Sequence, residues 1–148
     1  MNFLEVLQKV AKGELPESPA ADLIGFRVTK AEDAKVIIEL NVTEKLHNPM
    51  GTLHGGIICD IADAAMGYAF ATTLKKDELF STVEIKTNFL KPVFRGKLRA
   101  EGKLMKKGSS IGLLTCNIFD EKDELVAYST STCMVLKGQS NQKRIQVE

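Results

Sequence analysis

The stretch His47-Asn48-Pro49-Met50-Gly51-Thr52-Leu53-His54-Gly55-Gly56, followed by a helical segment from Ile57 to Thr73, is the most informative part of this chain. It contains both histidines of the 148 residues and places a pair of glycines at a helix start. The helix also carries Asp63, one of only two charged residues within it. Packing alone does not require this combination, so the stretch is where we look for chemistry.

The helical segment, roughly Gly55 to Leu74, is apolar nearly all the way round. At about 100° per residue its apolar side chains cover more than half of the circumference. Such a helix is buried on more than one side. The small residues Ala64, Gly67 and Ala71 lie on the remaining side and permit the close approach of a second element. The sequence therefore predicts a long helix that is wrapped by a sheet and touched by a neighbour.

Most of the other segments are predicted strands. Apolar and polar residues alternate at period two in 35–42, 83–89 and 96–104, and further strand-like runs occupy 111–119 and 126–136. Residues 25–30 are the expected hairpin partner of the first strand. A short amphipathic helix over 2–11 and a loop with two prolines make up the start of the chain, 1–22. Residues 137–148 are polar without a pattern, and we expect a loose tail.

This order of elements predicts one α+β domain over residues 1–148, in which a curled antiparallel β-sheet wraps one long central α-helix. A net charge of +1 gives no argument for a nucleic-acid or membrane partner. The three cysteines lie in apolar runs and are expected to be buried free thiols in a reducing compartment. No signal peptide and no 18-residue apolar segment is visible, so we expect a cytoplasmic protein.

The helix start is the first candidate for chemistry. Helix N-termini expose unpaired N–H groups, and Gly55 and Gly56 have no side chain to block a ligand. These amides can hold a carbonyl oxygen as it gains negative charge, and Asn48 could add a side-chain donor. Alternatively, the glycines simply allow a tight loop before the helix.

Asp63 is the second candidate. Its carboxylate borders apolar surface with no lysine or arginine nearby on the helix, which is costly unless the group has a task. It could activate a water or attack a carbonyl directly, although it could also be a solvent-facing acid at the helix rim. We interpret Asp60, further round the helix, mostly as such a solvent-facing acid.

The rise of the helix separates the two candidates. Asp63 lies eight residues beyond Gly55, which is about 12 Å along the axis. A carboxylate and an oxyanion hole that serve one carbonyl must both lie within a few Å of it. Two such helices packed antiparallel in a two-fold dimer would bring Asp63 of one copy near Gly55 of the other, twice.

The histidines are weaker candidates. His54 could donate a hydrogen bond to a substrate or brace the loop, and a lone histidine at a helix start is more often structural. His47 and His54 would need further ligands to hold a metal ion, and no such ligands can be identified, so we expect no metal site.

The sequence from Asn48 to Gly56, with Ala62-Asp63 in the helix that follows, resembles the signature of hotdog-fold acyl-CoA thioesterases. It is most similar to the PaaI type and to thioesterase superfamily member 2. The resemblance covers about Leu23 to Leu136 in element order as well as motif. It implies a hotdog fold, and a homodimer with sites at its interface that often forms a tetramer.

The resemblance also implies roles for individual residues. Asp63 matches the catalytic acid, Gly55 the backbone donor to the thioester oxygen and Asn48 the side-chain donor. His54 matches a histidine that lines the site, and Thr82 matches a Ser or Thr that helps to place the water. The coenzyme's phosphates need cations, for which we expect Lys91 and Arg95.

The resulting expectation is an acyl-CoA thioesterase that needs no cofactor, since CoA is part of the substrate. Two alternatives stay open: a hotdog protein that binds acyl-CoA without turnover, and a hotdog enoyl-CoA hydratase or dehydratase. The latter usually has a histidine a few residues after the Asp, and none follows Asp63. The acyl group is not readable, since four side chains could line either an aryl or a fatty-acyl pocket: Met66, Tyr68, Phe70 and Phe89.

Overall fold

The computed structural model describes residues 1–137 of the chain. The predicted loose tail over 137–148 therefore lies outside the described residues except for Lys137.

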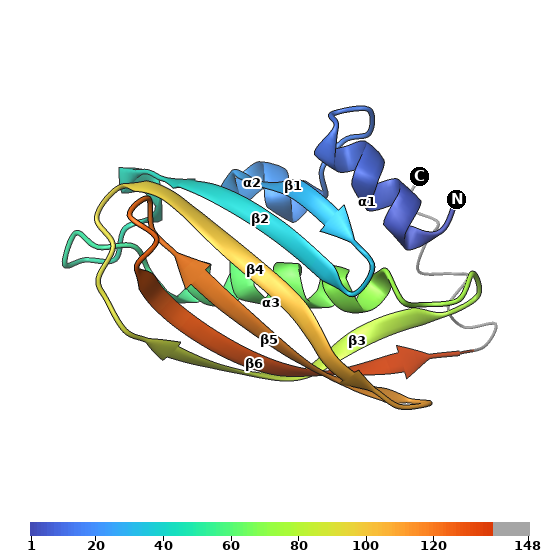
Figure 1. Ribbon diagram of the computed structural model, residues 1–148. Coiled ribbons are helices and arrows are strands. Elements are labelled where there is room, and N and C mark those ends of the chain that lie inside the picture. The colour runs from blue at the N-terminus through green and yellow to red at the C-terminus, as the bar shows by residue number, and fades with distance from the viewer. Residues whose placement is uncertain (138–148) are drawn as a thin grey trace.

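A six-stranded sheet curls around one long helix (Figure 1). The helix is α3 (Gly55–Ala71), and the strands lie in the order β1-β2-β4-β5-β6-β3 with every neighbouring pair antiparallel. This is the α+β architecture that the sequence predicts. The strands are β1 (Phe26–Glu32), β2 (Lys35–Val42), β3 (Leu79–Phe89), β4 (Gly96–Lys107), β5 (Ile111–Phe119) and β6 (Leu125–Leu136).

The core lies between α3 and the concave face of the sheet. Ile61, Met66 and Phe70 of the helix are fully buried against inward-facing residues of the strands. The helix and β4 lie very close at Gly102, where an added Cβ would be 2.2 Å from the carbonyl oxygen of Ala65. The central strand therefore needs a residue without a side chain at this position.

Two shorter helices precede the sheet, and the second is a correction to the sequence analysis. Helix α1 (Phe3–Ala11) is capped by Asn2, close to the predicted bounds. Helix α2 (Pro19–Ile24) occupies what we expected to be loop. Ser18 caps it through the N–H of Ala21, and Pro19 takes the first helical position, where its missing N–H costs nothing.

Strand β3 also differs from the prediction. It begins at Leu79, and its register with β6 shifts between Thr82 and Glu84. Thr82 pairs with the buried Cys133, whereas Glu84 pairs with Thr132, whose side chain lies on the opposite face of the sheet. The β-bulge reverses the alternation, so Val83 is 58% exposed although the period-two pattern groups it with Ile85 on the buried face.

The cysteines are free thiols, and two of them are buried as predicted. Burial is the main cause that raises the pKa of Cys116, to about 12, and it also raises the pKa of Cys133. Cys59 is only half-buried, and its Sγ lies 3.6 Å from Oγ1 of Thr87.

Candidate active site

The loop before α3 is fixed by its own polar groups. The side-chain oxygen of Asn48 accepts hydrogen bonds from the N–H groups of Met50 and Thr52, at 3.0 and 3.2 Å. Its Nδ2 donates to Thr52 Oγ1 at 2.9 Å, which leaves one N–H of the amide for another acceptor. Gly51, with φ of 81°, supplies the left-handed turn within the loop.

His54 caps the helix that this loop introduces. Its Nδ1 accepts the N–H of Gly56 at 2.9 Å, so the neutral imidazole carries its proton on Nε2. The N–H groups of Ile57 and Ile58 point to the carbonyl of His54. Among the described residues, the N–H of Gly55 is therefore the one amide of the first turn without a partner.

An aromatic ring lies close to Gly55. An added Cβ on Gly55 would be 3.1 Å from Cζ of Phe89, the last residue of β3, and Phe89 is itself 56% exposed. The glycine thus allows the end of β3 to lie close to the helix start.

Asp63 lies two turns further along α3 and is half-buried. The hydroxyl of Thr82 on β3 donates to its Oδ1 at 2.8 Å, and Thr82 Oγ1 is also 3.9 Å from Cys133 Sγ. The bulge at Val83 is what turns Thr82 inward to make this contact. The structure therefore brings together two of the predicted site residues, one from the helix and one from the sheet.

Two cavities meet at this pair, and Asp60, Asp63 and Thr82 line both of them. The larger, about 420 Å³, runs along α3 and β3 and also contacts Gly56 and Cys59. The smaller, about 200 Å³, extends toward α2 and β1 and is lined by aromatic side chains and small residues. Asn48, His54 and Gly55 line neither cavity, whereas Gly56, the next residue of the helix start, lines the larger cavity together with Asp63.

Three sequence interpretations are corrected here. Asp60 is half-buried rather than solvent-facing, and its Oδ2 is buried without a hydrogen-bond partner among the described residues. Gly67 makes room for Phe80 of the same chain, since an added Cβ would lie 3.0 Å from that ring. Met66 and Phe70 are fully buried in the core and so do not line a pocket.

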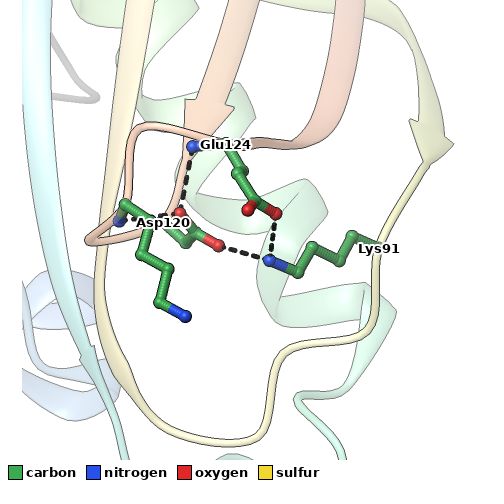
Figure 2. Close-up of polar contacts among 4 residues, drawn as sticks. Lys91, Asp120 and Glu124 are labelled. Carbon is green, nitrogen blue, oxygen red and sulfur yellow. Dashed lines mark hydrogen bonds and ion pairs between the residues drawn. The ribbon is translucent and has the colours of Figure 1, made fainter.

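The predicted phosphate contacts lie elsewhere, in a cleft of about 590 Å³ that includes His47, Lys91 and Arg95. Figure 2 shows the Lys91 ammonium directed at the carboxylates of Asp120, at 2.8 Å, and Glu124. These two hydrogen bonds raise the pKa of Lys91, and the ammonium lowers the pKa of Asp120. Arg95 forms no ion pair within the described part of the chain.

Residues 1–137 contain no group of three or more His, Cys, Asp or Glu side chains placed to hold a metal ion. Nor does any helix in this range have the length and apolar character needed to cross a membrane.

Comparison with known proteins decides the family. Residues 50–127, which include α3 and the Asp63–Thr82 pair, match the family described as the thioesterase superfamily. The chain belongs to the thioesterase superfamily. Membership of this family makes it a thioester hydrolase.

Individual members of the superfamily are similar over most of their length. A 1,4-dihydroxy-2-naphthoyl-CoA hydrolase of Listeria monocytogenes is 32% identical over 116 residues, which cover 78% of this chain and 94% of that protein. The PaaI protein of the E. coli phenylacetic acid degradation operon superposes with a TM-score of 0.80 at 19% identity, covering 93% and 99% of the two chains.

A thioesterase from Haemophilus influenzae gives a TM-score of 0.79 at 22% identity, with 88% and 90% of the chains covered. These structural matches confirm the predicted hotdog fold, and the family match confirms the resemblance to thioesterases.

Proposed function

We propose that this chain hydrolyses the thioester of an acyl- or aryl-acyl-CoA to the free acid and CoA, at sites shared between two copies of the chain. The observation that carries the proposal is the Asp63 carboxylate, which is held by Thr82 at the junction of two cavities. A carboxylate positioned in this way has a free oxygen with which to take a proton from water or to attack a carbonyl carbon.

The start of α3 supplies hydrogen-bond donors for the thioester oxygen. As the thioester carbonyl becomes tetrahedral, its oxygen gains negative charge, and the unpartnered N–H of Gly55 is oriented to donate to it. The remaining N–H of the Asn48 amide is the second donor, and its loop contacts hold it in place. The exposed Nε2–H of His54 is a further donor at the site entrance.

Asp63 can carry the proton that the hydrolysis has to move. A proton passes from water to Asp63 as the new C–O bond forms, and it leaves for the CoA sulfur as the C–S bond breaks. If Asp63 itself attacks, an anhydride forms as the C–S bond breaks and CoA leaves as the thiolate. Water then cleaves the anhydride to the free acid and the Asp63 carboxylate, and its proton passes to the thiolate. The same two donors would serve both routes. CoA is part of the substrate, so no separate cofactor is required.

Edge strand β3 supports assembly as a homodimer. Within the described sheet it pairs only with β6, so one edge of an 11-residue strand has unpaired backbone groups. Long exposed edges favour pairing with another chain. A two-fold axis beside β3 and α3 would bring Asp63 of one copy toward Gly55 of the other, as the helix rise requires.

The smaller cavity suits an aryl acyl group. Phe26, Tyr68 and Phe80 line its walls, and its volume of about 200 Å³ is comparable with an apolar cavity of about 150 Å³ that holds benzene. The Listeria relative is named for an aromatic acyl-CoA, which supports the same preference. The cleft with Arg95 would receive the phosphates of the coenzyme.

Thiol release from a panel of aryl-, short- and long-chain acyl-CoAs tests the proposal. We expect turnover with aryl substrates, and its loss by at least about 1,000-fold in Asp63→Asn and Asp63→Ala. Asp77→Asn, in the exposed loop after α3, is the matched control. Circular dichroism and sedimentation would show whether each variant keeps its fold and dimer. Full activity in either Asp63 variant, or no thiol release from any substrate, would refute the proposal.

A further inference from the structure

Asp60 is the acid that the hydrolytic scheme leaves unused. It lies one turn before Asp63 on α3, and the two side chains line the same two cavities. Residues three apart on a helix are neighbours, with Cβ atoms about 5–6 Å apart. The candidate active site therefore contains two carboxyl groups rather than one.

The two carboxyl groups have different surroundings. Asp63 receives the hydroxyl hydrogen bond of Thr82, which stabilises its ionised form. Asp60 Oδ2 is buried and has no partner among the described residues. A buried carboxylate oxygen without a donor disfavours ionisation. Burial first, and then the negative charge of Asp63, raise the pKa of Asp60.

The described groups around Asp60 and Asp63 do not offset the negative charge of these two carboxylates. The other titratable side chains that line the two cavities are Cys59 and Tyr68 of α3 and Glu84 of β3. The walls formed by α2 and β1 contribute residues that do not titrate, such as Phe26. No lysine, arginine or histidine of the described residues lines either cavity. Within one chain, a retained proton is therefore a means of limiting the repulsion between the two carboxylates.

We propose that Asp60 is a positioning residue of the hydrolytic site, which holds a proton beside ionised Asp63 and thereby sets how strongly Asp63 attracts the proton of the attacking water. This inference rests on the proposed function. While Asp60 is neutral, the pair carries one negative charge. Once Asp60 ionises, the pair carries two, and the transfer of a proton from water to Asp63 relieves their repulsion. The doubly ionised pair is therefore the stronger base.

Carboxyl NMR of ¹³C-labelled aspartates tests the coupling without turnover. Asp60 should titrate above the ordinary aspartate value of about 3.9, and its midpoint should fall toward that value in Asp63→Asn. An ordinary midpoint, or one that does not move in Asp63→Asn, would overturn the inference. The titration of the wild-type protein decides the matter even if an Asp60 variant fails to fold.

The pH profile of kcat/KM tests the role in the reaction. We expect two steps on the acid side of the wild-type profile and loss of the upper step in Asp60→Asn. The high-pH plateau of Asp60→Asn should be about threefold to tenfold lower, mainly through kcat. Asp60→Glu should restore the upper step, and Asp77→Asn should leave the profile unchanged.

The two proposals fail in different ways. Full turnover in Asp63→Asn would reject the hydrolytic scheme and with it the role of Asp60. If Asp63→Asn loses activity but Asp60→Asn keeps the pH profile of the wild-type enzyme, only the role of Asp60 is rejected.

Discussion

The hydroxyl of Thr82 on β3 lies 2.8 Å from Asp63 Oδ1 on α3 and donates a hydrogen bond to it. The contact joins the edge of the sheet to the central helix at the point where two cavities meet. Hydrogen bonds to charged groups are worth about 1.5–3 kcal/mol, so this contact is strong enough to orient the carboxylate.

Thr82→Val should lower kcat by about tenfold to hundredfold, because the variant keeps the side-chain shape but loses the donor that orients Asp63. Thr82→Ser keeps the hydroxyl and should retain most of the activity. Steady-state kinetics with one aryl-CoA substrate provides the measurement, and thermal melts check the fold. Equal rates in the valine and serine variants would show that the hydroxyl has no part in the reaction.

Gly55→Ala should lower kcat/KM by about tenfold while the protein remains folded. The new Cβ would lie 3.1 Å from the exposed ring of Phe89, which must shift to make room next to the amide that we propose binds the thioester oxygen. Removing the ring as well, in Gly55→Ala with Phe89→Ala, should recover part of the loss. Gly108→Ala is the matched control, since its nearest contact is at 3.6 Å. The hypothesis fails if Gly55→Ala has the kinetics of this control.

Arg95→Ala should raise the KM for acyl-CoA by about threefold to tenfold, and more than Lys91→Ala does. The charge of Lys91 is already balanced by Asp120 and Glu124, whereas Arg95 has no such partner in the described residues. An acyl-pantetheine, which has no phosphates, is the control substrate, and its KM should be the same in all three proteins. A larger effect of Lys91→Ala would reverse this assignment.

Gly102→Ala should destabilise the protein by about 3 kcal/mol or more. The added Cβ would lie 2.2 Å from the backbone carbonyl oxygen of Ala65, so α3 must move away from the centre of the sheet. Urea unfolding followed by circular dichroism measures the change, again with Gly108→Ala as the control. A variant as stable as wild type would mean that helix and sheet can separate there at no cost.

The regular elements were predictable, and Asp63 could be chosen as a candidate, because each has a local signal. The apolar circumference of the segment after Gly55 identified the buried helix, and period-two alternation identified the sheet strands. Asp63 was identified because a charge beside apolar surface is costly. Helix α2 also has local signals, a capping Ser18 before Pro19, but its six residues were too short to show periodicity.

The remaining features depend on contacts that periodicity does not encode. Thr82 was identified only through the family resemblance, since strict alternation assigns it to the outer face. Gly67 was interpreted as a surface for another helix, but the space is filled by Phe80, which lies 13 residues later in the chain. Asp60 was misjudged because the sequence does not reveal that its inner oxygen would be covered without receiving a donor.

The bulge at Val83 changes which residues of β3 face the helix. Before it, even-numbered residues such as Phe80 and Thr82 face the helix, and after it the odd-numbered residues from Ile85 onward do so. If the same residues were pleated regularly, with Val83 paired in register, one of these two sets would turn outward. A designer who regularised this strand without changing its sequence would obtain a smoother sheet and lose the hydroxyl that holds the Asp63 carboxylate, so the irregularity is itself part of the candidate site.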